Sequence, residues 1–193
     1  MNKGRLEAFS DGVIAIIITI MILELRVPHG ADAAVLRPMI PAFISYVMSF
    51  VFVAIYWNNH HHLMHAVKHV DGRVLWANMH LLFWLSLIPM ATGWMGDSRF
   101  AAVPVALYGV VLLFSGLAYF VLCRTLIAHH GRESVLAGAV GKDFKGTISM
   151  VFYAVAVPLA FASAWLACGL CVVVAIMWLV PDRRIERALA QRD

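Results

Sequence analysis

Near the start of the chain, an apolar run at 13–23 closely follows four residues that combine charge, hydroxyl and aromatic character: Arg5, Phe9, Ser10 and Asp11. An ionisable pair is costly to keep at the mouth of a membrane helix, and it marks a functional site by default. A carboxylate beside a hydroxyl can hold a cation, relay a proton or anchor neighbouring helices. These residues are therefore the first candidates for chemistry in this chain.

The apolar run has a directional pattern. Ile16, Ile20 and Leu23 stand at i, i+4 and i+7, which places them on one stripe of a helix, with Thr19 beside it. Asp11 precedes Ile16 by five residues, about 140° around the helix, so it points away from this stripe. The helix therefore has two working faces.

Two interpretations of this helix stay open. In the first, the apolar stripe packs inside its own bundle and residues 10–12 only cap the helix. In the second, the stripe faces a pore, because no other span offers a polar pore-lining stripe. A buried carboxylate needs charged or hydrogen-bonding partners, and His and Asn residues at 56–62 and 76–80 lie at the same membrane end as Asp11. We expect a polar network there.

The composition is that of an integral membrane protein. Of 193 residues, 62% are hydrophobic and 13% are charged, which is more apolar surface than a soluble core of this size can bury. The net charge of +4 does not indicate nucleic acid as a partner, because the basic residues lie in short blocks between apolar spans. No nucleophile with a base, phosphate-binding loop or metal triad is present, so we expect neither an enzyme nor a cofactor.

Two spacings are typical of metal or redox sites. Cys168 and Cys171 are separated by two residues inside an apolar span, where we expect buried thiols. His61, His65 and His69 stand at i, i+4 and i+8, as ligands on one helical face would. No acidic or cysteine cluster completes a site beside these histidines, so we expect no bound metal.

Long uncharged runs predict six transmembrane helices, since one crossing needs roughly 20 apolar residues. The expected spans are residues 5–27, 38–62, 73–95, 100–127, 144–162 and 165–181, followed by a basic tail at 182–193. The last two spans form a hairpin with a turn at 162–169. Twelve of the 15 lysines and arginines then lie on one side, which places both termini in the cytoplasm. The expected fold class is an all-α, polytopic membrane protein with a single domain over 1–193.

Specific motifs occupy the first half of the chain. They are Arg5-x3-Phe-Ser-Asp-Gly12, Ala15-Ile-x2-Thr19, Leu23-Glu-Leu25, Tyr56-Trp-x2-His-His61, Asn78-x3-Leu82 and Leu87-x-Pro89. Together they resemble the transmembrane protein 175 family of potassium channels. The second half agrees with that family only in its number of spans.

The resemblance implies a fold, a permeant ion and a set of site residues. Six helices would form one subunit, and four subunits would assemble as a homotetramer in the inner membrane around a central potassium pore lined by the first helix. Ile16 would form a hydrophobic constriction, with Ile20 and Leu23 further along the pore and Thr19 assisting selectivity. A structural polar network would hold the pore helix, with the members Arg5, Phe9, Ser10, Asp11, His60, His61 and Asn78.

A ring of isoleucine side chains cannot coordinate an ion, and no Thr-Val-Gly-Tyr-Gly filter loop occurs in the sequence. Selection would then rest on partial dehydration, which costs potassium less than sodium, so we expect passive conduction with modest potassium selectivity. The main alternative is a proton-coupled transporter that uses Asp11 and nearby histidines as a relay. Such transporters usually carry the charged site near the bilayer midplane and show internal repeats, whereas Asp11 lies near one end of its span.

Overall fold

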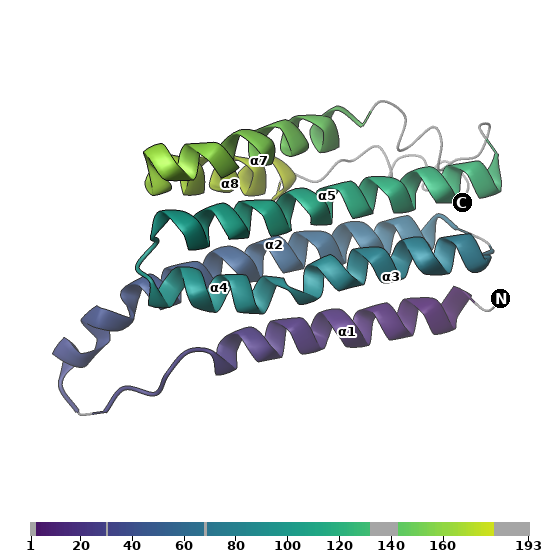
Figure 1. The fold of residues 1–193 in the computed structure, drawn as a ribbon. Coiled ribbons are helices and arrows are strands. Elements are labelled where there is room, and N and C mark those ends of the chain that lie inside the picture. The colour runs from purple at the N-terminus through teal and green to yellow at the C-terminus, as the bar shows by residue number, and fades with distance from the viewer. Residues whose placement is uncertain (1–2, 30, 68, 132–142, 180–193) are drawn as a thin grey trace.

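The computed structural model describes residues 3–29, 31–67, 69–131 and 143–179, and all regular structure in these ranges is helical. The elements are α1 (Lys3–Leu23), the 3₁₀ helix η1 (Ala33–Met39), α2 (Ile40–His65), α3 (Gly72–Ser86), α4 (Ile88–Asp97), α5 (Ala102–His130), α7 (Phe144–Ala162) and α8 (Ala164–Leu179). They lie side by side in one elongated bundle (Figure 1). The all-α prediction is confirmed for the described part of the chain.

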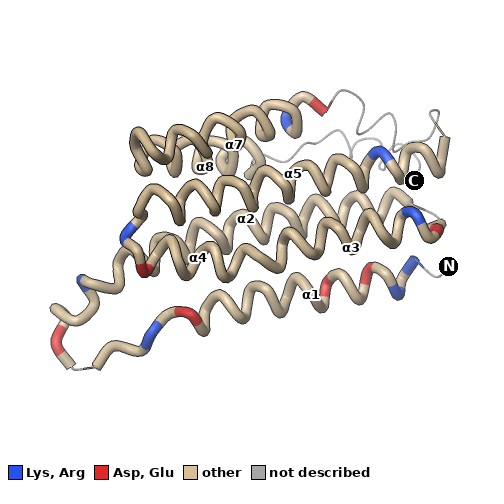
Figure 2. The backbone as a smooth tube through the Cα atoms, viewed as in Figure 1, with Lys and Arg blue, Asp and Glu red and all other residues tan. Residues whose placement is uncertain are grey.

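The helices are of a length and composition that suit a bilayer. Five described segments are long and apolar enough to cross a membrane, with α3 and α4 together forming one of them, and α8 is a shorter apolar helix. Figure 2 shows the charged residues of α1 to α5 toward the two ends of the bundle, and those of α7 at its start. The start of α1, the start of α3 and the end of α5 share one end (Figure 1). The expected tail at 182–193 and residues 180–181 lie outside the described residues.

The third membrane pass is divided at Leu87. The expected span at 73–95 was one continuous helix, whereas α3 and α4 meet at this residue. Pro89 in the first turn of α4 has no backbone N–H, so it cannot continue the hydrogen-bond ladder of α3. The Leu87 N–H donates to the Trp84 carbonyl at 3.2 Å and closes α3 with a tighter turn.

The first helix is shorter than expected. The predicted span at 5–27 ends in the structure at Leu23. Pro28 disfavours helical geometry in the residue before it, and Arg26 Nη2 turns to Asp97 Oδ2 at 3.3 Å. The chain therefore leaves the helix where its side chains become charged.

The hairpin of α7 and α8 is confirmed, but its turn is much tighter than predicted. The expected turn at 162–169 is reduced to Ser163, because α8 already begins at the next residue. Ser163 is extended, with φ −157° and ψ 107°, and its Oγ accepts a hydrogen bond from the Leu166 N–H at 3.4 Å. A hydroxyl at this N-terminal position stabilises the start of α8, so one residue is enough for the reversal.

The core is held by close helix packing and by hydroxyl contacts between helices. Helix α5 lies in the middle and packs against α3, α4, α7 and α8. Ser49 Oγ lies 2.6 Å from Thr92 Oγ1 and 3.0 Å from Tyr108 Oη, which links α2, α4 and α5. Gly96 lets α4 approach α2, since a Cβ there would lie 2.7 Å from Ala42 Cα. Small residues and buried hydroxyls are the usual means of association between membrane helices.

Candidate functional site

Helix α1 packs on one side only. Its buried residues are Leu6, Ser10, Ile14, Ile17 and Met21, which follow the helical repeat and face α2, α3 and α4. The opposite side has no neighbour among the described residues. The structure thus gives α1 one face toward the bundle and one open face.

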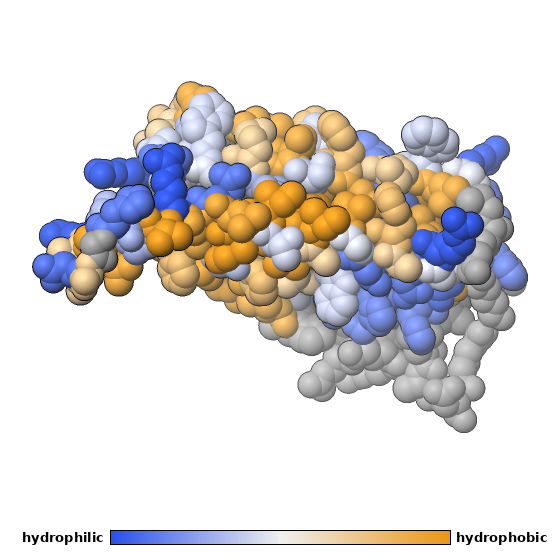
Figure 3. All heavy atoms as spheres, turned by 90° about the horizontal axis from the view of Figure 1, so that it is seen from below, coloured by the Kyte–Doolittle hydropathy of each residue, from blue (hydrophilic) through white to orange (hydrophobic). Residues whose placement is uncertain are grey.

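The open face carries the apolar stripe. Ile16 is 57% exposed, Ile20 is 42% exposed and Leu23 is 81% exposed. Thr19 lies on the same face, and its hydroxyl donates to the Ile16 carbonyl at 2.9 Å. Figure 3 views the molecule from below, on the α1 side, and shows an apolar band across the middle with hydrophilic surface toward both ends. Within one subunit, this stripe therefore does not pack in the core.

A buried polar network joins α1, α2 and α3. Asn78 Nδ2 donates to Ser10 Oγ at 2.9 Å, and Asn78 Oδ1 lies 2.8 Å from His60 Nε2. All three side chains are buried. The network lies toward the end of the bundle where α1 and α3 begin (Figure 1).

Hydrogen-bond directions in this network set the histidine tautomer. Ser10 Oγ donates to the Leu6 carbonyl at 2.9 Å, so it accepts from the Asn78 amide. The Asn78 carbonyl oxygen is then the acceptor for His60, which must carry a proton on Nε2. His60 Nδ1 is buried and has no hydrogen-bond partner among the described residues. The Asn78 side chain therefore hydrogen-bonds to both neighbours, as the donor to Ser10 and the acceptor for His60.

Asp11 lies outside this network and makes a separate contact. Asp11 Oδ1 accepts a hydrogen bond from Trp57 Nε1 at 3.0 Å, which attaches α1 to α2. A second link between the two helices joins His61 Nδ1 and Glu7 Oε1, 3.8 Å apart. Trp57 also stacks on His61 with a centroid distance of 5.8 Å. The carboxylate is thus turned toward α2 and away from the open stripe.

The structure brings together only part of the predicted polar set. Ser10, His60 and Asn78 meet, whereas Arg5 and Phe9 lie on the exposed side of α1. Arg5 forms no salt bridge with the residues described. The sequence did not lead us to expect Glu7 in the network, and it placed Trp57 only within the Tyr56–His61 motif. The signal for both was helical spacing, because Glu7 precedes Asp11 by four residues and Trp57 precedes His61 by four.

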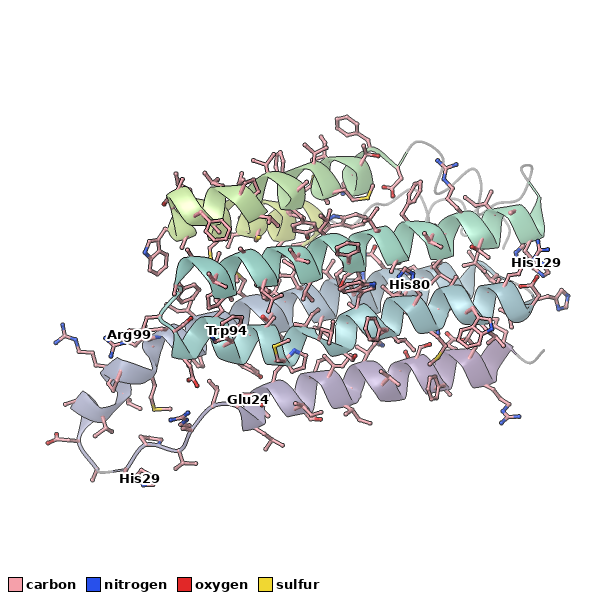
Figure 4. All side chains as sticks on the ribbon, viewed as in Figure 1. Glu24, His29, His80, Trp94, Arg99 and His129 are labelled. Carbon is pink, nitrogen blue, oxygen red and sulfur yellow. The ribbon has the colours of Figure 1, made fainter. Side chains whose placement is uncertain are left out.

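A groove runs beside the open stripe, between α1 and α4. Its lining includes Ile16 and Ile20 from α1 and Trp94 from α4, with Glu24 and Asp97 at one end. Figure 4 shows Glu24 at the end of α1 and Trp94 on α4. Asp97 also forms the ion pair with Arg26 that closes the end of α1. Both partners are largely exposed, so this pair adds little stability.

Among the described residues, the two spacings typical of metal sites have the following geometry. Helix α2 ends at His65, so His69 lies beyond it and the three histidines do not share one helical face. Cys168 and Cys171 are buried free thiols. In the part of the chain that the structure describes, no group of three His, Cys, Asp or Glu side chains is arranged to hold a metal ion.

Comparison with known proteins gives consistent results. Residues 5–89 match the family described as endosomal/lysosomal potassium channel TMEM175. The chain is 53% identical over 191 residues to a potassium channel of Chryseobacterium sp. (strain P1-3), covering 99% of this chain and 100% of the relative. It is 33% identical to a potassium channel of Streptomyces collinus, covering 85% of each. It also resembles the crystal structure of a lysosomal potassium-selective channel TMEM175 homologue from Chamaesiphon minutus, with a TM-score of 0.81 and 28% identity over 93% of this chain and 97% of that one.

Proposed function

Because this chain belongs to the TMEM175 family, we propose that it is a potassium-permeable cation channel whose α1 helices line the pore. The family is one of ion channels and not of enzymes, and the chain is a multi-pass membrane protein. The bacterial relatives compared above are named as potassium channels, which supports potassium as the permeant ion. The inner membrane is the proposed location, with lipid and potassium ions as partners.

The observation that carries this proposal is the open apolar face of α1. The interior of the subunit is filled by large side chains such as Phe52, Tyr108 and Leu112, which are almost completely buried. Close packing of this kind argues against an ion path through the core formed by the described helices. A conduction path must then lie between copies of the chain, and α1 offers a face with no partner among the described residues.

We assign the pore to a homotetramer with four α1 helices around its axis. Ile16 forms the narrow ring, and Ile20 and Leu23 line the pore further along. Thr19 supports selectivity at the level between Ile16 and Ile20. The apolar ring selects by dehydration and can close by dewetting. Selectivity for potassium over sodium is modest, because no carbonyl oxygens replace the water shell of the ion.

The remaining polar side chains hold α1 in place. Ser10, Asn78 and His60 connect α1 to α3 and α2, and Asp11 adds the contact to Trp57. A pore helix needs a defined rotation, since a turn of a few tens of degrees would replace Ile16 by its neighbours. Arg5 and Phe9, on the open side of α1, are free to contact another copy.

The proton-coupled alternative makes a different prediction for potassium flux. The purified protein is reconstituted in liposomes loaded with potassium, and efflux is measured with and without an imposed pH gradient. We expect fast passive efflux along the potassium gradient alone. Empty liposomes serve as the control. Efflux that requires a pH gradient, at turnover rates of a carrier, would replace the channel proposal by the transporter in which Asp11 and histidines relay protons.

Asp11→Ala tests whether this carboxylate is structural. The substitution removes the acceptor for Trp57 Nε1, so α1 is held less firmly and we expect a lower tetramer yield in size-exclusion chromatography or a channel locked in one gating state. Asp11→Asn keeps an oxygen acceptor and is the matched control, with nearly normal assembly. Normal assembly of Asp11→Ala together with lost potassium selectivity would instead make Asp11 an ion-binding residue.

A further inference from the structure

A second groove, whose lining includes no residue of α1, lies between α3 and α5 at the end of the bundle where α3 begins. Its walls carry basic, aromatic and hydroxyl side chains from the two helices: Arg73, Trp76 and His80 from α3, and Arg124, Thr125 and His129 from α5. Figure 4 shows His80 along α3 and His129 at the end of α5. Small residues, Ala77 and Ala128, also line it and leave it open.

The two guanidinium groups of this groove have unused donors. Among the described residues, neither Arg73 nor Arg124 takes part in a salt bridge. Arg124 lies over the Phe120 ring at 4.9 Å from its centroid, which holds the side chain against α5. A guanidinium stacked on its face still presents its N–H groups at the edge, in the geometry that suits phosphate oxygens.

The one carboxylate that lines the groove among the described residues is already engaged. Asp71 caps α3 by accepting from the Val74 N–H at 2.9 Å, and its other oxygen lies 3.3 Å from His129 Nδ1. The hydrogen bond from the Val74 N–H is the main cause that lowers the pKa of Asp71. Asp71 thus stays ionised and is bound by the Val74 N–H and His129. Its single negative charge does not cancel the two positive charges of Arg73 and Arg124, so the groove keeps a net positive charge.

The groove sits at the depth of lipid headgroups. Trp76 is 78% exposed beside it, and tryptophan prefers the interface between membrane and water. Toward the middle of the bundle, Trp84 stacks on Phe114 at a centroid distance of 4.5 Å, and Trp84 Nε1 donates to His80 Nε2 at 3.0 Å. From the end of the bundle inward, the groove therefore offers first the cationic arginines, then the interfacial Trp76, and then the apolar surface of Trp84 and Phe114.

We propose that this groove binds the phosphate of an anionic phospholipid, with Arg73 and Arg124 as its donors and an acyl chain lying over Trp84 and Phe114. Basic pockets between membrane helices on the cytoplasmic side are typical sites for anionic headgroups. Twelve of the 15 lysines and arginines lie on this side of the spans, which by the positive-inside rule places this end of the bundle in the inner leaflet. The site is separate from the pore and does not depend on which ion is conducted.

The test measures how lipid changes thermal stability. Protein in neutral detergent is mixed with phosphatidylglycerol or phosphatidylcholine, and the melting midpoint is read by fluorescence-detected size exclusion. We expect phosphatidylglycerol to raise the midpoint by about 5 °C or more, because a ligand that binds only the folded state stabilises it. The Arg73→Gln/Arg124→Gln double variant should lose this rise. The matched control Arg37→Gln/Arg99→Gln, which removes two exposed arginines at the opposite end, should keep it.

Two further arms make the result decisive. Inorganic phosphate alone should give no rise, and a rise equal to that of phosphatidylglycerol would assign the groove to a free anion and overturn the lipid. If the double variant does not fold, the site is tested by tryptophan fluorescence instead, on proteins that keep both arginines. Bromine atoms on a lipid quench only nearby tryptophans, so quenching by a brominated lipid reports where that lipid binds. Brominated phosphatidylglycerol should quench wild type more than Trp84→Phe, because the acyl chain is proposed to lie over Trp84. Equal quenching of the two proteins, or equal rises in the midpoint with both lipids, would overturn the proposal.

Discussion

Ile16→Asn is expected to raise single-channel conductance and to reduce the preference for potassium over sodium. In the proposed pore, a ring of Ile16 side chains would make each ion shed water without replacing it, and potassium bears this cost better than sodium. An amide at this position supplies oxygen atoms and holds water, so both ions pass with less dehydration. A tenfold fall in the permeability ratio is about 1.4 kcal/mol, or about 60 mV at 2.3 kcal/mol per 100 mV. We expect the bi-ionic reversal potential to move toward zero by about 20–60 mV on this scale.

The matched control is Ile22→Asn on the same helix. Ile22 is also exposed, at 45%, but it lies about 120° around the helix from Ile16 and so outside the proposed pore stripe. It should leave the reversal potential unchanged in planar bilayer recordings. An unchanged reversal potential in Ile16→Asn, or an equal shift in both variants, would remove Ile16 from the constriction.

Asn78→Ala is expected to destabilise the subunit more than any other single polar substitution in α3. Removing the amide leaves the His60 Nε2–H without its acceptor and Ser10 Oγ without its donor, both in buried positions. Unsatisfied buried groups cost about 1–3 kcal/mol, and hydrogen bonds between membrane helices fall toward the lower part of this range. The melting midpoint should fall by roughly 3–8 °C.

Asn59→Ala controls for the loss of an asparagine. Among the described residues, the Asn59 amide donates only to the Ile55 carbonyl of its own helix, at 2.8 Å, so its removal should lower the midpoint much less. Coupling within the network is measured by combining Asn78→Ala with Ser10→Ala, whose effects should not add because the residues share one hydrogen bond. Additive effects would mean that Ser10 and Asn78 contribute independently, against the network described above.

The place of the polar network could be predicted from the sequence, but its members could not all be identified. Span direction puts the end of α2 and the start of α3 beside the start of α1, so contact between Ser10, His60 and Asn78 follows from topology. The choice of Trp57 as partner of Asp11 does not, because it depends on how far each helix is rotated about its axis. Side-chain packing along the whole interface decides that rotation.

The breaks in the helices show the same division. Pro89 in the sequence indicates a weak point in the third pass, yet the position of the break at Leu87 follows from local hydrogen bonding. The turn at Ser163 is shorter than expected, because a serine cap can start α8 at once. Apolar runs define where a helix can cross a membrane, whereas caps and prolines decide where it ends.

By itself, the sequence determined that this is a multi-pass, all-α membrane protein of the TMEM175 family. Hydropathy, charge blocks and the Phe9-Ser10-Asp11 signature are properties of short stretches of the chain, so they can be identified without knowledge of any tertiary contact. It also placed Ile16, Ile20 and Leu23 on one stripe, since helical periodicity needs no neighbour. Only the tertiary structure decided that this stripe is left open while Ser10 and Ile14 turn inward. That outcome depends on the shapes of α2, α3 and α4, whose side chains pack over one face of α1 and leave the other face without a partner among the described residues.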